Sequence, residues 1–225
     1  MKYSGFGITF HLLKESDIEL VRQWRNDPVV VRNYEYREHI TPEMQAAWFK
    51  KINNINNLYT IIEYKEEKVG VINIKNIDWE TQDCEGGIFF PDVKYHQTTL
   101  PAVISYMTTE LIFSMFDWKM VKAHVLKENK SVQAFVQMLG YEKLPGQEEI
   151  NNQAFQITRE LFMKKAPRLR KAVSVLTGSS ERGILQIETD EFADPVVMQW
   201  EAVVRSSPYI QKTEHNAEGR FYYFS

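Results

Sequence analysis

The chain has little of several residue types that define common protein classes. Cys84 is the one cysteine among 225 residues, so no disulfide can form within the chain, and this favours a reducing compartment. No run of 18 apolar residues could cross a membrane, and the N-terminus lacks the apolar core of a signal peptide. The sequence therefore predicts a soluble, cytoplasmic protein.

An excess of charge of one sign is also lacking. The chain has 27 basic and 30 acidic residues, and a net charge of -3 gives no general attraction to nucleic acid or to an anionic membrane. The five histidines and the cysteine show no metal-ligand spacing, and neither G-x-x-x-x-G-K nor G-x-G-x-x-G occurs. We therefore expect no metal, no nucleic acid and no membrane partner. What is present, 44% hydrophobic and 13% aromatic residues, suffices for a folded core.

Hydrophobic periodicity and turn signals predict the order β-α-α-β-β-β-α-β-α-β-β, an α+β fold with a mixed sheet. Two helix starts are marked, by Ser16 with Glu19 in a capping-box spacing and by Thr41 followed by Pro42. We expect strands at residues 8–13, 58–64, 69–77, 84–90, 121–126, 141–144 and 153–162. We expect helices at residues 16–26, 41–52, 101–116 and 129–139.

The periodic pattern changes after about residue 164. A helix is expected at 164–176, followed by a strand at 183–188, a helix at 195–205 and a strand at 221–224. Some sixty residues are too few for a large core of their own. We therefore expect a main domain at 1–163 and a small α/β extension at 164–225, whose role the sequence does not show.

The stretch Asn129 to Tyr141, NKSVQAFVQMLGY, is the most informative in the chain. Asn129 is placed to cap a helix whose apolar face includes Val132, Phe135 and Val136, and Gly140 closes it. An ordinary βα unit with an asparagine cap would look similar. Strand, asparagine, short amphipathic helix and Gly-Tyr together resemble the closing half of the acyl-CoA site in the GNAT superfamily of N-acetyltransferases, whose fold has the predicted element order.

This resemblance implies acetyl-CoA as acyl donor, with its diphosphate on a glycine-rich turn at a helix N-terminus. Here the turn reads YHQTTLPA from residue 95 to 102, and the glycines are missing in either of two registers, with Thr99 or Leu100 at the first glycine. Val136 stands where relatives often have a tyrosine acid. The resemblance implies these cofactor contacts: Phe89, Phe90, His96, Gln97, Thr98, Thr99, Asn129 and Phe135.

Two residues are candidates for the general base. Glu85 opens EGGIFF, which resembles the E-x-G-x-x-x strand of the ribosomal-protein and aminosugar branches, and His124 lies on the adjacent strand. A solvated strand-end Glu85 and a structural His124 are the alternatives. Cys84 as an acyl-accepting nucleophile is a third, weaker possibility, because no partner base is evident.

The segment Leu20 to Pro28, LVRQWRNDP, with Trp48-Phe49, resembles acetyltransferases that modify nucleotide-linked aminosugars and the wider branch of ribosomal-protein N-terminal acetyltransferases. Gln45 stands where the aminosugar type often has histidine. The resemblance implies that a phosphate or sugar is held by Arg25, Asn26, Arg32 and Tyr34. The alternative is that the arginines pair with helix carboxylates.

We therefore expect an N-acetyltransferase that acts on a primary amine, of a nucleotide-linked aminosugar or another small metabolite. Two alternatives remain: a non-catalytic GNAT-fold binding or regulatory protein, and a protein N-terminal acetyltransferase. The sequence also leaves a homodimer open.

Overall fold

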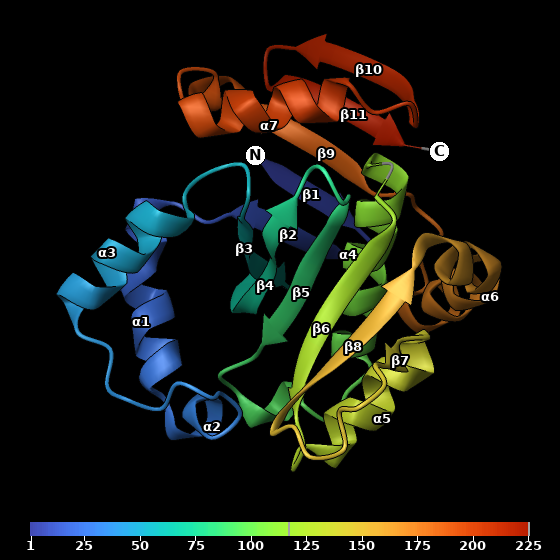
Figure 1. Cartoon of the computed structure of the whole chain (residues 1–225). Helices are drawn as coiled ribbons and strands as arrows, with labels where there is room; N and C mark the ends of the chain where they lie inside the picture. The colour runs from blue at the N-terminus through green and yellow to red at the C-terminus, as the bar shows by residue number, and fades with distance from the viewer. Residues whose placement is uncertain (117, 225) are drawn as a thin grey trace.

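The computed structural model describes residues 1–116 and 118–224. The chain forms one sheet with helices on both faces (Figure 1), and the described strands follow the order β10-β11-β9-β1-β2-β3-β4-β5-β6-β8-β7. Neighbouring strands are antiparallel except β5 and β6, which run parallel. The predicted α+β class, with a mixed and mostly antiparallel sheet flanked by helices, is confirmed.

The strands are β1 (Lys2–Gly5), β2 (Ile8–Leu12), β3 (Leu58–Tyr64), β4 (Glu67–Asp78), β5 (Asp83–Phe89), β6 (Met120–Leu126), β7 (Glu142–Lys143), β8 (Asn152–Thr158), β9 (Ile184–Glu188), β10 (Ile210–Asn216) and β11 (Gly219–Phe224). The helices are α1 (Ile18–Asn26), α2 (Pro28–Val31), α3 (Pro42–Ile52), α4 (Leu100–Met115), α5 (Lys130–Leu139), α6 (Arg159–Thr177) and α7 (Pro195–Arg205).

Most of the predicted helix boundaries are confirmed. Helix α1 ends before Asp27-Pro28, and the Thr41 hydroxyl accepts a hydrogen bond from Met44 N at 3.3 Å at the start of α3. The Ser16 cap is wrong, because residues 15–17 form a 3-10 turn and α1 begins at Ile18. The bond that closes this turn runs from Lys14 N to Asp17 Oδ2 at 3.2 Å. The one-turn helix α2 was not expected.

Two hairpins shape the sheet on the N-terminal side. The predicted β3–β4 hairpin turns through Lys65 and Glu66, whose φ values of 53° and 65° suit a tight turn between twisted strands. Strand β1, which was not predicted, pairs with β2 through a turn in which Phe6 and Gly7 have φ values of 52° and 75°. Strand β1 thereby becomes the attachment point for the C-terminal segment.

The C-terminal segment continues the same sheet. Strand β9 pairs with β1, β11 pairs with β9, and β10 pairs with β11 (Figure 1). The expected strand at 153–162 is too long, because Thr158 caps α6, which begins at Arg159 and not at residue 164. The expected boundary between residues 163 and 164 thus falls within α6, and the division into two domains stays a prediction.

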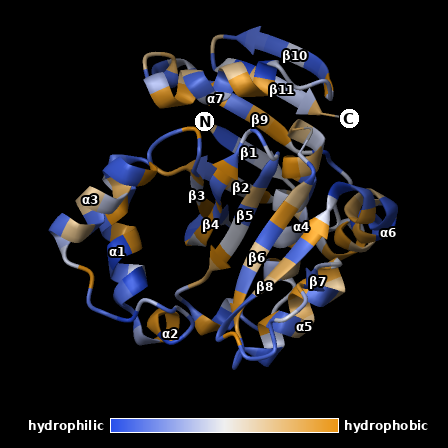
Figure 2. Cartoon of the chain, viewed as in Figure 1, coloured by the Kyte–Doolittle hydropathy of each residue, from blue (hydrophilic) through white to orange (hydrophobic). Residues whose placement is uncertain are grey.

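The two faces of the sheet bury different cores. On one face a small cluster beneath α1 and α3 comprises Leu13, Val21, Phe49, Ile61 and Val71. On the other face a much larger cluster involves α4, α5, α6 and α7. Eleven of the sixteen residues of α4 are buried, which marks it as the central core helix. Figure 2 shows hydrophobic residues along the central strands and α4, and hydrophilic residues on α1 and α3.

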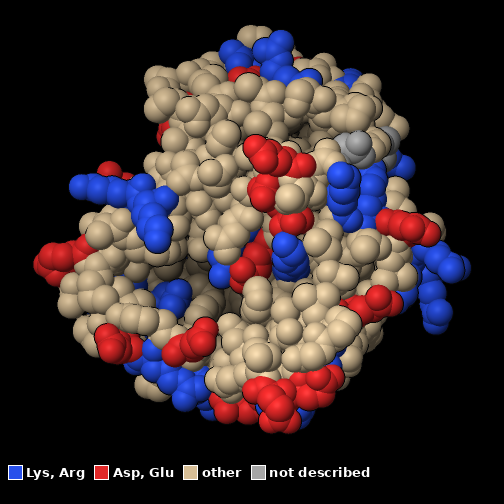
Figure 3. Space-filling model, viewed as in Figure 1, with Lys and Arg blue, Asp and Glu red and all other residues tan. Residues whose placement is uncertain are grey.

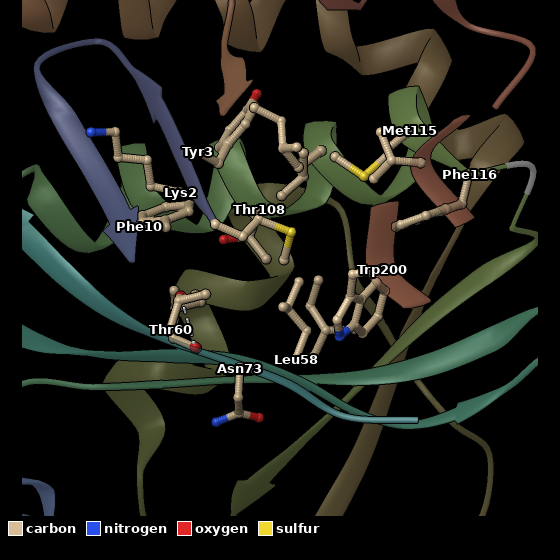
Figure 4. Close-up of a pocket in the computed structure, with 16 residues that line it drawn as sticks. Lys2, Tyr3, Phe10, Leu58, Thr60, Asn73, Thr108, Met115, Phe116 and Trp200 are labelled. Atoms are coloured by element: carbon tan, nitrogen blue, oxygen red, sulfur yellow. Dashed lines mark hydrogen bonds between the residues drawn. The ribbon is translucent and has the colours of Figure 1, made fainter. Parts of the chain in front are cut away.

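A small apolar cavity lies on the α4 face, between β3, β4, α4 and α7. Its volume is about 30 Å³, and Leu58, Met115, Phe116 and Trp200 help to line it (Figure 4). This volume holds about one water molecule, and apolar cavities of this kind stay dry. The cavity is a packing feature and is far too small for a ligand.

None of the helices, over the residues that are described, is both long enough and apolar enough to span a membrane.

Candidate active site at the splayed strands

Strands β5 and β6 pair over a short distance and then separate. The parallel ladder includes Asp83 with Met120, Cys84 with Val121 and Glu85 with Lys122, and it ends there. Beyond this point β5 stays paired with β4, and β6 stays paired with β8. The edges that face each other after residues 85 and 122 therefore carry backbone N–H and C=O groups without a ladder partner, within the described chain. Such groups need a partner, and an extended ligand in the gap could provide it.

The structure brings the two candidate bases together at the start of this gap. Glu85 Oε1 lies 3.2 Å from His124 Nδ1 and 2.9 Å from Lys75 Nζ. Glu85 Oε2 accepts a hydrogen bond from Asn76 Nδ2 at 3.1 Å. With a carboxylate at Nδ1, the imidazole proton belongs on that nitrogen, and Nε2 keeps its lone pair. The pair can therefore accept a proton at His124 Nε2.

The electrostatic surroundings assign different roles to the two residues. Burial of the Glu85 carboxyl favours its neutral form, but the Lys75 ammonium and the His124 imidazole favour the charged form and hold the pKa of Glu85 below its usual range. The Glu85 side chain is 16% exposed, so it is not a freely solvated strand-end carboxylate. A carboxylate with a lowered pKa is a weak base. Glu85 is therefore better suited to orient the His124 imidazole than to accept the proton itself.

Cys84 does not take part in this site. Its side chain points to the opposite face of the sheet from Glu85, since neighbouring strand residues alternate, and it is 1% exposed in the large core. Burial raises the pKa of the Cys84 thiol, so the thiolate that a nucleophile needs is disfavoured.

The turn that precedes α4 is held by its own side chains. His96 Nε2 lies 3.0 Å from the carbonyl oxygen of Phe90, which ties the turn to the end of β5. The Thr98 hydroxyl donates to the carbonyl oxygen of Tyr95 at 2.8 Å and accepts from Leu100 N at 3.2 Å. His96 and Thr98 therefore brace the turn, whereas Gln97 and Thr99 are exposed without a side-chain hydrogen bond in the described structure.

Free backbone donors remain although the turn has no glycine. The N–H groups of Gln97, Thr99 and Ala102 donate no hydrogen bond to any residue of the described chain. All three lie at or just before the N-terminal first turn of α4, the positive end of its dipole. Unsatisfied N–H groups at a helix N-terminus form a site for an anion such as a diphosphate.

Asn129 caps α5 as the sequence predicts. Its Oδ1 accepts from Val132 N at 3.2 Å and from the Ser131 hydroxyl at 3.0 Å, and Gly140 closes the helix with a φ of 107°. Its Nδ2 donates to Oδ1 of Asn33, which lies in the segment after α2, at 3.4 Å. Asn129 thus joins the β6–α5 loop to the helical side of the site.

The aromatic residues expected around the cofactor lie on different faces of the sheet. The Phe89 ring packs edge-on against Tyr34, with ring centroids 5.9 Å apart, on the α1–α3 face. Phe90 is buried in the large core, and half-buried Phe135 packs against the same core. Val136, where relatives often have tyrosine, is buried as well.

The expected acceptor residues meet only in part. The Arg25 guanidinium lies over the Tyr34 ring, 4.1 Å from its centroid, and Arg25 Nε is buried with no hydrogen-bond partner among the described residues. Asn26 has a structural role, because its side-chain amide pairs with the backbone of Ile40. Its Nδ2 donates to the Ile40 carbonyl oxygen at 2.9 Å, and its Oδ1 accepts from Ile40 N at 2.8 Å. Arg32 is exposed on the surface. Arg25 and Tyr34 therefore lie together as one wall of the candidate site, and their binding of the acceptor stays a prediction.

Sequence reasoning missed two residues on the sheet side of this wall. Tyr59 packs edge-on against Trp48 with centroids 5.1 Å apart, and it lies opposite Asn73 in the β3–β4 ladder. Burial, with the nearby Tyr34 and Glu85, raises the pKa of Tyr59 to about 12 against the opposing effect of Arg25. Strand alternation could have placed both on this face, but the partners across the sheet depend on register. Figure 3 shows a hollow on this side of the molecule, between the α1–α3 part and the central strands, with acidic and basic side chains around it.

Comparisons with known proteins find a matching family and two named relatives. Residues 8–142 match the family described as "Acetyltransferase (GNAT) domain". An acetyltransferase named PseH from Campylobacter jejuni strain 81-176 is 28% identical over 125 residues, which cover 54% of this chain and 74% of that protein. PseH from strain NCTC 11168 is 27% identical over 122 residues, 53% of this chain and 73% of that protein.

Solved structures share the fold. A spermidine N-acetyltransferase from Vibrio cholerae in complex with CoA and spermine has a TM-score of 0.63 at 12% identity and covers 71% of this chain and 99% of its own. A domain from Methanocaldococcus jannaschii has a TM-score of 0.55 at 20% identity and covers 67% of this chain and 97% of its own.

Proposed function

The chain belongs to the GNAT acetyltransferase family and is therefore an N-acetyltransferase, and we propose that it transfers the acetyl group of acetyl-CoA to a primary amine on a nucleotide-linked aminosugar. The observation that carries this proposal is the splay between β5 and β6, with the Glu85–His124 pair at its start and free amides at the α4 N-terminus. These features lie where a thioester, a base and a diphosphate are needed together.

The donor is held by backbone groups more than by side chains. The unpaired edges of β5 and β6 bind the amide-containing arm of acetyl-CoA, and the amides of Gln97, Thr99 and Ala102 bind its diphosphate. The bound donor supplies the activated acetyl group. Thr98 and His96 keep the turn in the shape that exposes those amides.

His124 acts as the general base. The acceptor amine gives up a proton to His124 Nε2 as its nitrogen forms the bond to the acetyl carbonyl carbon, and the carbon–sulfur bond to CoA breaks. Glu85 holds the Nδ1–H tautomer and stabilises the imidazolium. The leaving thiolate takes a proton from water, because Val136 offers no acid where relatives often have tyrosine.

Arg25 and Tyr34 recognise the acceptor. The unpartnered Nε–H of Arg25 is suited to a phosphate or sugar oxygen, and the guanidinium is already oriented by the Tyr34 ring. The resemblance of the segment around Trp24 to aminosugar acetyltransferases supports the same acceptor. A homodimer, and a separate role for residues 164–225, stay predictions.

The test is an acceptor screen with purified protein and acetyl-CoA. Thiol release and product mass are measured with nucleotide-linked aminosugars, with spermidine and with peptides that have a free N-terminus. We expect acetylation of an aminosugar, and its loss in a His124→Gln variant of unchanged melting temperature. Turnover of spermidine or peptides alone would contradict the acceptor assignment. No thiol release with any amine, and no thermal stabilisation by acetyl-CoA, would favour the non-catalytic alternative.

A further inference from the structure

Asn73 on β4 is a buried polar side chain that the fold does not explain. It is 8% exposed, and its Oδ1 has no hydrogen-bond partner among the described residues. Figure 4 shows the Asn73 amide pointing away from the apolar cavity, on the opposite face of the sheet. A buried acceptor without a partner lowers the stability of the fold, so its presence in a folded protein needs a reason.

The neighbours of Asn73 place it beside the proposed Glu85–His124 site. Its ladder partners are Tyr59 on β3 and Gly87 on β5, and the pair two residues further along β4–β5 is Lys75 with Glu85. Alternate residues share a face, so Asn73 lies on the same face as Glu85 and His124. The amide therefore lies on the face of the sheet that carries Glu85 and His124, two residues along β4 from the partner of Glu85.

Gly87 keeps this position open. A Cβ at residue 87 would come within 3.2 Å of both Nδ2 and Oδ1 of Asn73, closer than an ordinary contact. Residue 87 lies just beyond the point at which β5 separates from β6. The missing side chain leaves room for the Asn73 amide and for a ligand group beside it.

We propose that the Asn73 carboxamide binds the reacting amine of the acceptor and directs its lone pair toward the acetyl group, an inference that rests on the proposed function. In an attacking amine the lone pair faces the acetyl carbon. The N–H groups of the amine therefore point to other sides, where they donate hydrogen bonds to acceptors. The Asn73 carboxamide oxygen accepts such a bond and carries no charge. A carboxylate at this position would favour the protonated amine, which cannot attack.

The experiment compares Asn73→Leu with Asn73→Asp, with both substrates varied. In Asn73→Leu we expect the KM for the amine to rise at least tenfold and the KM for acetyl-CoA to stay within twofold. Its melting temperature should not fall, because the unpartnered oxygen is gone. Asn73→Asp keeps an acceptor oxygen, so amine binding should be restored and the pH optimum should move upward.

Gly87→Ala offers a second, independent variant. Its added Cβ displaces the amide, so we expect the KM for the amine to rise while Asn73 itself is intact. An unchanged amine KM in Asn73→Leu, an equal rise in the KM for acetyl-CoA, or a fall in its melting temperature would each overturn the inference. A wild-type protein that acetylates no amine overturns the proposed function and this inference together.

Discussion

The two faces of the central sheet differ in the polarity of the side chains that they bury. The face beneath α1 and α3 carries Glu85, His124 and Asn73, and two of its buried polar atoms, Arg25 Nε and Asn73 Oδ1, have no partner in the described structure. The face beneath α4 and α7 is largely apolar around a cavity of about 30 Å³, although Trp200 Nε1 there also has no hydrogen-bond partner among the described residues. Unsatisfied polar groups lower stability and apolar burial raises it. We therefore expect the first face to serve chemistry and the second to stabilise the fold.

The strongest test of this contrast removes the base from the polar face. His124→Ala should lower kcat by about 10²–10⁴-fold, the usual contribution of a general base, and leave the melting temperature nearly unchanged. Steady-state kinetics and thermal unfolding measure the two effects. His215→Ala, on exposed strand β10, is the matched control and should retain full activity. A normal kcat in His124→Ala would contradict the proposal that His124 is the general base.

The converse change is made on the apolar face. Trp200 is 1% exposed and packs near Trp79 and Phe116, with ring centroids 6.2 Å and 6.3 Å away. Trp200→Ala should lower the free energy of unfolding by about 3–5 kcal/mol, while kcat below the unfolding transition stays unchanged. Chemical denaturation provides the measurement. Trp200→Phe retains a ring and removes an unpartnered Nε1–H, so it should cost much less.

A smaller effect is expected at the turn before α4. Thr99 has a φ of -78°, which proline can adopt, and its N–H has no partner in the described fold. Thr99→Pro removes that donor, and a hydrogen bond to a charged group is worth about 1.5–3 kcal/mol, so the KM for acetyl-CoA should rise roughly 10–100-fold. Thr99→Ala keeps the N–H and should change this KM little. Equal effects of the two variants would assign binding to the hydroxyl.

The smallest expected effect is on pH dependence. The folded pKa of Glu85 lies below its ordinary value, so its ion pairs stabilise the protein above the ordinary carboxyl pKa of about 4.3, and this stabilisation is lost as the pH falls through the lower folded value. Glu85→Gln should therefore be less stable than wild type at pH 7, by up to about 1 kcal/mol, and the difference should vanish in acid. Urea denaturation across pH 3–7 measures it. A difference that grows in acid would contradict the sign.

Local signals predicted the fold well where they were strong. Thr41, Asn129 and Gly140 act as helix boundaries as expected, because caps and left-handed glycines are local features. Strand β10 and helix α2 were missed for physical reasons. The residues of β10, IQKTEHN, are polar and mostly exposed on an edge strand, and α2 has only four residues.

The sequence named part of the candidate site, but not Tyr59 or Asn73 and not the arrangement of the residues. The sequence named Glu85 and His124 separately, and only the parallel β5–β6 register brings them within 3.2 Å of each other. Likewise, nothing in the residues around Asn73 shows that its oxygen lacks a partner, because that depends on three neighbouring strands. The side chains of His96 and Thr98, which were expected to bind the donor, form hydrogen bonds within the turn, and their contact with the donor stays a prediction.

The measurement that tests the account most directly is a crystal structure of the protein with bound CoA. We expect the pantetheine arm between residues 86–89 and 123–126, with the diphosphate on the amides of Gln97, Thr99 and Ala102. CoA bound elsewhere, or β5 and β6 paired along their whole length with the turn left empty, would contradict it.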